Sequence, residues 1–367
     1  MFGMQREAIL RRSHWQPGHK LLAYIEATQH RSEQALPPSL LRDYLEDENV
    51  SAWLSGQELS ADIEGTAVDV DATIRLLVSE QPTWHQTITS FGMSKVSYLQ
   101  VERAFQIPEE ALSCFETTRG RHTCHFDYDA DGRTVESIAI TVSFAPMFQL
   151  GNFSLALRSY CKTGRTRALL HGSSVIEARN KVTNEASTPH IDSIQCFISQ
   201  AGHLFNHPLL IPVAMMEERI RRMSYHQRFD LGQRLHQIEA TLGVTKAGRR
   251  LHHSKGLGPE GLIESDLKRA ELTVKLSTAI TDAIGFTNTI KCDARFIQFL
   301  LDTNFQLLRE GLVDARLHRD MKAIVYDLKC EYESITEYQQ SLTARLQLQL
   351  NVVSFYLVKS FTVGSRA

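Results

Sequence analysis

The chain has no cysteine pair at CxxC spacing, no extended apolar run and no large excess of charge of either sign. Its six cysteines are scattered along 367 residues, which is typical of reduced thiols rather than of a secreted disulfide framework. The 40 basic and 42 acidic residues give a formal net charge of -2, so no overall positive field favours nucleic-acid binding. Apolar residues make up 43% of the chain against only 10 prolines, a globular composition that excludes wholesale disorder.

No segment of the sequence is apolar for the roughly 20 residues that a bilayer-spanning helix requires. The longest apolar run, at 209–216, contains Pro212, and glutamine, asparagine and lysine interrupt the stretch at 346–361. Residues 1–20 carry arginines and histidines and lack the apolar core of a secretory signal. We therefore expect a soluble, cytoplasmic chain.

Motifs of the common enzyme classes are also missing. The sequence has no GxSxG elbow, no Walker A loop, no GxGxxG after a strand and no HExxH pair. One basic stretch, at 246–255, has glycine spacing and no interleaved aromatic residues, which favours a solvated loop over a nucleic-acid contact. We expect neither an enzyme nor a nucleic-acid-binding protein.

The pattern along the chain predicts four segments. Residues 1–94 are polar and irregular and predict a variable N-terminal extension, partly helical, with a helix at 39–45 after Pro37 and Pro38. Residues 95–312 predict an α/β domain, with a sheet at about 121–172 and helices from 189. A long stalk-like helix at 313–358 and a tail at 359–367 complete the chain.

Four strand-like runs predict the sheet, at 123–128, 135–144, 153–160 and 166–170. Ile138, Ile140 and Val142 recur with the two-residue period of a strand. The connections between the runs are too short for crossover helices, so we expect mostly antiparallel pairing.

From Pro189 onward the apolar residues recur at three- and four-residue steps, which predicts helices at 208–242, 262–284 and 293–308. The last helix carries the longest series, called here the last-helix stripe: Leu317, Met321, Ile324, Leu328, Ile335, Tyr338, Leu342, Leu346 and Val353. Some forty residues at ~1.5 Å rise give a rod of about 55–60 Å, which one compact domain cannot cover. We expect the stripe to pack on partner helices, within the chain or in an oligomer.

The predicted fold class is therefore α+β. A small, mostly antiparallel sheet is flanked by helices, and long antiparallel helices follow it and end in the stalk-like helix.

Three stretches of sequence share an order and a spacing with a known family. The first stretch is HPLLIPV at 207–213, which opens a helix that closes at LGV, 242–244. The second is the pair NFSLAL at 152–157 and RALLHG at 167–172, which precedes that helix. The third is LTARLQLQLNVV at 342–353. Together, over about 95–353, they resemble the cytosolic domain of fungal CorA-like divalent metal-ion transporters. In the family these stretches are the first cytosolic helix, the strand pair before it, and the stalk helix that leads toward the membrane.

The resemblance implies a cytosolic domain of a magnesium or other divalent metal-ion transporter. Family members are integral membrane proteins that assemble as pentamers, with this domain facing the cytosol and a Gly-Met-Asn motif in the pore. This chain has no membrane helix after the stalk, and its Gly92-Met93-Ser94 lies too early to be that motif. The implied role is thus regulatory, or the chain is a truncated gene product, with a homo-oligomer or full-length CorA-like subunits as partners. The alternative is a soluble helical protein-interaction module with no link to ions.

The clearest local motif is DYDADG, which places Asp127, Asp129 and Asp131 at alternate positions before Gly132. Alternating carboxylates followed by glycine resemble the opening of a calcium-binding EF-hand loop. The twelfth position is Ile138 instead of glutamate, and the flanks predict strands. A hairpin turn is favoured, and the three aspartates remain a weak candidate cation site.

Histidines and arginines supply the remaining candidates. His122 and Cys124 share one strand face and His125 the other, so a zinc site is disfavoured. His203 and His207 lie one helical turn apart beside Pro208, which favours capping or packing over metal binding. The arginines at 219, 221 and 222 are predicted to lie on the solvent face of their helix.

Overall fold

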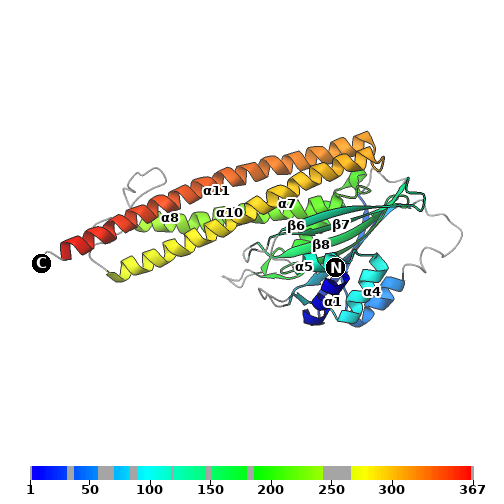
Figure 1. Cartoon of the computed structure of the whole chain (residues 1–367), viewed down its shortest axis with the longest axis horizontal. Coiled ribbons are helices and arrows are strands. Elements are labelled where there is room, and N and C mark those ends of the chain that lie inside the picture. Colours follow the sequence, from blue (N-terminus) through cyan, green and yellow to red (C-terminus); the bar gives the residue numbers. More distant parts are fainter. Residues whose placement is uncertain are drawn as a thin grey trace. The chain divides into compact units, whose positions relative to one another are not determined.

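A seven-stranded sheet is the central element of the computed structural model (Figure 1). The structure describes residues 2–30, 37–56, 70–82, 89–116, 120–145, 147, 150–179, 186–242 and 266–364. The strands are β2 (Leu22–His30), β3 (Ser39–Tyr44), β4 (Val70–Glu80), β6 (Arg121–Tyr128), β7 (Val135–Ser143), β8 (Phe153–Tyr160) and β9 (Arg165–Gly172). Their order is β3-β2-β4-β9-β8-β7-β6, and every neighbouring pair is antiparallel except β4 and β9. The expected mixed α+β fold with a mostly antiparallel sheet is confirmed.

The N-terminal residues are part of this sheet, so the expected separate extension at 1–94 is wrong. Strands β2, β3 and β4 all come from it, and β4 joins the later strands by pairing in parallel with β9. The helix expected at 39–45 is strand β3, which pairs with β2 from Ser39 to Tyr44. Backbone pairing with a strand upstream overrides the local helix signal that the two prolines gave.

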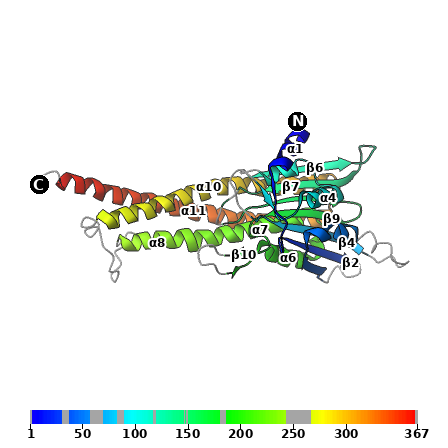
Figure 2. The same cartoon turned by 90° about the horizontal axis from the view of Figure 1, so that it is seen from below.

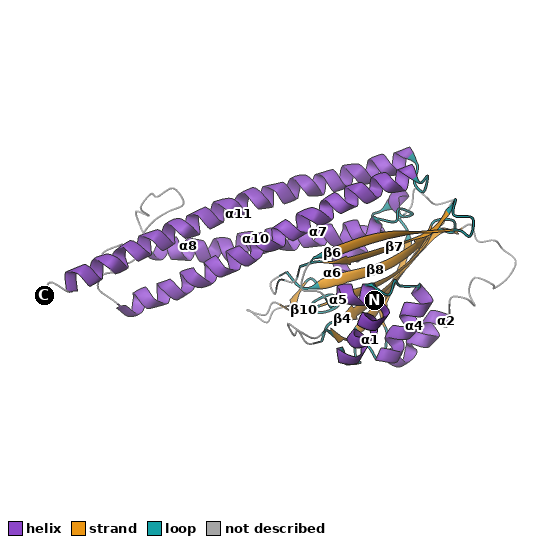
Figure 3. Ribbon diagram, viewed as in Figure 1, coloured by secondary structure: helices purple, strands orange, loops and turns teal. Residues whose placement is uncertain are grey.

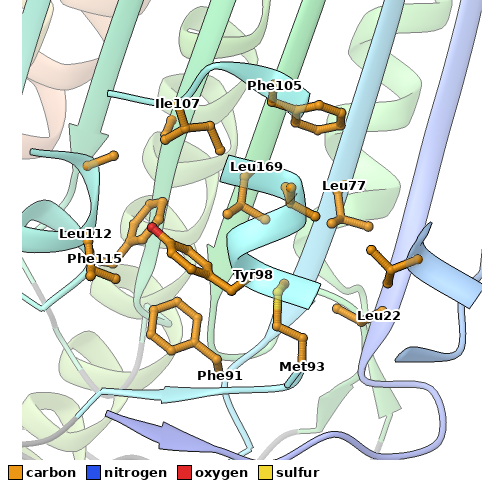
Figure 4. Close-up of a cluster of buried hydrophobic side chains, with 14 of the residues drawn as sticks. Leu22, Leu77, Phe91, Met93, Tyr98, Phe105, Ile107, Leu112, Phe115 and Leu169 are labelled. Carbon is orange, nitrogen blue, oxygen red and sulfur yellow. The ribbon is translucent and has the colours of Figure 1, made fainter. Parts of the chain in front are cut away.

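One face of the sheet is covered by short N-terminal elements (Figure 2). These are α1 (Phe2–Arg12), α2 (Val50–Ser55), α4 (Lys95–Phe105) and α5 (Ala111–Phe115), with the short strands β1 (His14–Trp15) and β5 (Ser90–Phe91) and the 3-10 turn η2 (Asp47–Asn49). Figure 4 shows their core, in which Phe91, Tyr98 and Phe115 lie over Leu77 and Leu169 of the sheet. The three aromatic side chains are at most 4% exposed, so this cluster anchors the N-terminal elements to the sheet.

Most of the described residues from 190 onward are helical (Figure 3). The helical elements are α6 (His190–Ser199), the 3-10 turn η3 (Gly202–Leu204), α7 (Leu210–Tyr225), the π-helical turn η4 (His226–Leu231), α8 (Gly232–Thr241), α10 (Asp266–Arg309) and α11 (Ala315–Gly364), after a small hairpin of β10 (Ala178–Arg179) and β11 (Ala186–Ser187). The two helices expected at 262–284 and 293–308 are one helix, α10, because Phe286 and Ile290 in the expected gap are buried.

A tight turn joins the two longest helices. Gly311, with φ 70°, ends α10, and the amides of Gly311 and Leu312 donate to the carbonyls of Leu308 and Leu307 at 3.0 and 2.9 Å. Asp314 caps α11 by accepting the Leu317 amide at 2.8 Å.

The chain divides into two compact units, and both are discontinuous in sequence. The first comprises 1–219 and 292–328, and the second comprises 220–291 and 329–367. This division differs from the expected boundaries after 94, 312 and 358, because α7, α10 and α11 each run from one unit into the other.

Candidate functional site

The DYDADG motif lies in the β6–β7 hairpin, where Asp129 organises the turn. Its Oδ1 accepts the amides of Arg133 and Thr134 at 3.1 and 3.3 Å, and these bonds lower the pKa of Asp129. Gly132 has φ 68°, which the left-handed position of this turn requires. The turn favoured from the sequence is confirmed.

The other two aspartates of the motif make different contacts. Asp127 pairs with Arg158 and accepts the Ser137 hydroxyl at 3.1 Å, whereas Asp131 is exposed. Across the described residues, no group of three or more His, Cys, Asp and Glu side chains is placed to hold a metal ion.

The His-Cys-His run of β6 is split between the two faces of the sheet. The His122 ring lies tilted against the Phe299 ring with centroids 4.6 Å apart, and burial lowers the pKa of His122. Burial raises the pKa of Cys124 to about 12. His125 points the other way and lies 2.8 Å from the Glu110 carboxylate. The expected divergence of these side chains is confirmed.

His203 and His207 are also separate, as the capping interpretation predicted. His203 contacts the Asp320 carboxylate at 2.8 Å. His207 is 2% exposed, its Nδ1 accepts the Leu209 amide at 3.1 Å, and its Nε2 lies 3.2 Å from Asn304 Oδ1. Burial lowers the pKa of His207 to about 4, so the ring is neutral at pH 7.

Gly92-Met93-Ser94 has a structural role. Met93 is fully buried in the N-terminal core, and Ser94 caps α4 by accepting the Ser97 amide at 3.1 Å. The basic stretch at 246–255 lies outside the described residues.

The last-helix stripe is largely buried by the chain itself. Six of its nine residues are at most 6% exposed (Met321, Leu328, Ile335, Leu342, Leu346 and Val353), and Leu317, Ile324 and Tyr338 are half-buried. In the second unit η4, α8 and α10 contact α11 through side chains described below. The stripe was expected to pack on helices of the same chain or of an oligomer, and the structure shows helices of the same chain. Among the side chains of α11 whose burial is described in that unit, the large apolar ones that are exposed are Leu348 and Phe355, at 58% and 64%.

The most distinctive polar site of the first unit is a fully buried cluster, called here the buried polar cluster. It consists of His190 at the start of α6, Glu218 and Arg219 on α7, and Asp293 on α10, each at most 1% exposed. Arg219 Nε donates to Asp293 Oδ2 at 2.9 Å, and His190 Nδ1 lies 3.0 Å from Glu218 Oε1. Burial raises the pKa of Asp293, and the Arg219 charge opposes that shift.

The backbone between β7 and β8 completes this cluster. The Arg219 guanidinium donates to the carbonyls of Ala145 and Gly151 at 2.8 and 3.2 Å and lies 5.2 Å from the centre of the Phe144 ring. Gly151 has φ 76°, and a Cβ there would lie 2.6 Å from His190 Nε2. A glycine is therefore required for both halves of the cluster to meet this backbone.

A second buried carboxylate holds the loop that follows β9. The two Glu80 oxygens accept the amides of Ser174 and Ile176 at 2.6 and 2.8 Å. Burial raises the pKa of Glu80 to about 7, against the effect of these amides. The same loop accepts the amides of His190 and Ile191 at 3.2 and 3.0 Å, so it connects Glu80 to the start of α6.

The sequence interpretation missed this cluster and misassigned Arg219, which is fully buried instead of solvent-facing. A signal was present, because Arg219 lies four residues after Met215 and four before Met223, within the apolar phase of α7. Burial of a guanidinium needs a carboxylate partner, and Asp293 is 74 residues away in sequence. The arrangement holds no nucleophile or metal-ligand set; it fixes α6, α7 and α10 to the β7–β8 connection.

Comparison with known proteins gives a fold likeness only. No family model and no curated protein matches the sequence. The structure of the full-length CmaX protein matches 95% of this chain and 81% of its own, with a TM-score of 0.50 and 12% identity. The ZntB cytoplasmic domain from Vibrio parahaemolyticus RIMD 2210633 matches 80% of this chain and 88% of its own, with a TM-score of 0.38 and 8% identity. The chain shares its fold with CmaX, and neither likeness supports the fungal branch expected from the sequence.

Among the described helices, none has the length and apolar character needed to cross a membrane.

Proposed function

We propose that this chain is the sheet-and-stalk domain of a CorA-like divalent metal-ion transporter, with a regulatory role and an oligomeric state. The likeness of fold to the full-length CmaX protein along 95% of the chain is consistent with a domain of this kind. The stretches at 152–172, 207–244 and 342–353, which resemble the family in order and spacing, support it independently.

The observation that carries the proposal is the hairpin of two very long helices that leaves a sheet unit. Helices α10 and α11 have 44 and 50 residues, and both belong partly to each compact unit. The buried polar cluster fixes α7 and α10 to the backbone of the sheet unit at residues 219 and 293, next to the boundaries at 219/220 and 291/292.

The proposed regulator is a divalent cation, with Mg²⁺ as the first candidate. On α11, Glu331, Glu333 and Glu337 are exposed in the second unit and supply carboxylate oxygens of the kind Mg²⁺ prefers. Glu333 and Glu337 lie one turn apart on one side of α11, and Glu331 lies on another side. Cations bound between these carboxylates and those of neighbouring subunits would hold the subunits together, and their loss would release them.

Light scattering on the full chain, with Mg²⁺ and then with EDTA, tests this function. We expect a mass several times the 41.6 kDa of one chain in Mg²⁺ and a lower mass in EDTA. The variant Glu331→Gln/Glu333→Gln/Glu337→Gln should lose the Mg²⁺ dependence, and Glu271→Gln, at an exposed position of α10, should keep it. A mass of one chain under both conditions would overturn the proposal.

The alternative, a helical interaction module unrelated to ions, required the last-helix stripe to be open to a partner helix. The burial of that stripe by the chain's own helices weighs against it. The module would also show an ion-independent mass, so the same measurement separates the two functions.

A further inference from the structure

A π-helical turn interrupts an otherwise continuous helix in the second unit. Helix α7 ends at Tyr225, η4 spans His226–Leu231, and α8 begins at Gly232 with no break in the chain. The amide of Gly232 donates to the carbonyl of Gln227, five residues earlier. Such turns insert one residue into an α-helix and occur mostly where a helix has a specific task.

The turn corrects the phase of the buried residues. Met223, Gln227, Leu231 and Leu235 are at most 2% exposed and follow one another at four-residue steps. In an α-helix each such step drifts by about 40°, so three in succession would turn Leu235 away from the core. The wider π turn keeps all four on one side, and it places a glutamine among apolar residues.

Two buried glutamines then connect the three helices. Gln227 Nε2 donates to the Ile335 carbonyl on α11 at 2.7 Å and lies 3.4 Å from Gln339 Oε1. Gln339 Nε2 donates to the Ala283 carbonyl on α10 at 3.0 Å. Both side chains are 2% exposed, so they have no access to water as an alternative partner.

Hydrogen bonds between these side chains form only at one axial position of α11 relative to η4. Apolar packing does not require that position. A slide of α11 by one helical turn, about 5.4 Å, would move the Ile335 carbonyl and Gln339 out of reach of Gln227. The slide would bring the main-chain carbonyl of a neighbouring turn of α11 to Gln227, and Gln339 Nε2 would keep Thr343 Oγ1, 3.5 Å away on its own helix. Gln339 Oε1, however, would lose the Gln227 donor and stay buried without it, whereas leucine and isoleucine side chains could find equivalent neighbours. Gly232 keeps the turn closely packed, because a Cβ there would lie 3.1 Å from the Gln227 carbonyl oxygen and 3.5 Å from Tyr338 Oη.

We infer that the π turn and the pair Gln227 and Gln339 form a register lock, which holds α8, α10 and α11 in one axial alignment and must open before the long helices slide. The lock is independent of ion transport and of the oligomeric state proposed above. The lock gives the helices of the second unit one resting axial alignment, and the Gln227 and Gln339 hydrogen bonds are the contacts that must break before that alignment changes.

Cross-linking of paired cysteines in the full chain by a short bismaleimide tests the alignment, because such a reagent spans the length of the side chains it replaces. Arg345 Nη2 lies 2.6 Å from Glu239 Oε2, so a cross-link between Glu239→Cys and Arg345→Cys reports the resting register. Glu239→Cys with Ser341→Cys reports a slide of one turn. Both pairs remove the ion pair and leave the glutamines as the contacts between η4 and α11 that fix register. Mass spectrometry of the linked peptides separates these products from those of the native cysteines.

With both glutamines present, we expect the 239–345 link to form at least about tenfold faster than the 239–341 link, a ratio that about 1.4 kcal/mol of preference produces. In Gln227→Leu/Gln339→Leu the two rates should come within about twofold of each other, because leucine has no axial preference for a carbonyl. The matched control Gln233→Leu/Gln340→Leu changes two exposed glutamines on the same helices and should keep the full ratio.

An unchanged ratio in the double-leucine variant that folds, as judged by circular dichroism, would overturn the lock. Where that variant does not fold, the same comparison on Gln339→Leu decides, since it keeps the bond from Gln227 to Ile335. A ratio in Gln339→Leu equal to that of the control would overturn the inference as well.

Discussion

Arg219 on α7 and Asp293 on α10 form an ion pair that is buried completely, with a 2.9 Å bond from Nε to Oδ2 and exposed fractions of 0% and 1%. The remaining guanidinium donors reach the carbonyls of Ala145 and Gly151. A buried pair of this kind contributes little net stability compared with apolar residues, but the loss of one partner is costly. The ion pair instead fixes the positions of α7 and α10 against the backbone between β7 and β8.

Removing only the cation should therefore destabilise the chain strongly. Arg219→Met is expected to lower the free energy of unfolding by about 3–5 kcal/mol, since it leaves the Asp293 carboxylate buried without its partner. Arg219→Met/Asp293→Leu should recover part of that loss. Urea unfolding measures both, and a cost below about 1 kcal/mol for Arg219→Met, the range of exposed pairs, would contradict the burial argument.

Gly151 should tolerate no side chain. Gly151→Ala is expected to cost at least about 2 kcal/mol, because it combines a positive φ with a Cβ 2.6 Å from His190 Nε2. Gly132→Ala is the matched control, with φ 68° and nothing within 4 Å of the added Cβ, and should cost only about 1 kcal/mol. Equal thermal midpoints for the two variants would show that the contact with His190 is unimportant.

Glu80 should make stability fall as the pH rises toward neutrality. Its pKa in the folded chain is about 7, above the ordinary 4.5, so between these values the folded chain binds protons that the unfolded chain has released. Its contribution is present below pH 4.5 and is lost as the pH rises through 7. The unfolding free energy of the unsubstituted chain should fall relative to that of Glu80→Gln by up to about 3 kcal/mol across this range. Parallel urea midpoints for the two proteins at all pH values would refute this.

His171 should act with the opposite sign. It is 3% exposed and stacks on Phe91 with ring centroids 4.3 Å apart, and burial lowers its pKa to about 3 from the ordinary 6.5. Below pH 6.5 the unfolded chain takes up a proton that the folded chain does not, so stability is lost as the pH falls toward 3. His171→Phe should reduce this acid sensitivity by up to about 1.4 kcal/mol per pH unit. Acid unfolding curves of identical slope would argue against a buried, neutral ring.

The aspartates of the β6–β7 hairpin should differ in their effect on stability. Asp129→Ala is expected to lower the free energy of unfolding, because it removes the acceptor of the Arg133 and Thr134 amides. Asp131→Ala, at an exposed position, should be neutral within about 0.5 kcal/mol. Calorimetric titration with Mg²⁺ or Ca²⁺ provides the independent measurement for these residues. Heat that disappears in Asp131→Ala would restore the motif as a cation site.

The predicted parts of the fold are those in which local pattern and tertiary position agree. Strands β7, β8 and β9 were expected within a few residues of their bounds, because their apolar residues face covered sides of the sheet. The hairpin turn at Gly132, with φ 68°, was signalled by glycine next to polar residues. The spacing of apolar residues in the last helix was also clear from the sequence, because those residues lie on the side of the helix that is buried.

The candidate site depended on pairings that no local pattern contains. Arg219 is a buried residue only because Asp293 and two carbonyls meet it. Strands β2, β3 and β4 form only through pairing with one another and with β9. The sequence does not show which residue pairs with a polar side chain on an apolar helix face, because that partner comes from a distant segment. The sequence by itself determined the types of element and the phase of the long helices, since these follow from backbone geometry and side-chain spacing. Only the tertiary structure decided which distant groups compensate each buried charge and amide, because that depends on contacts between segments far apart in the chain.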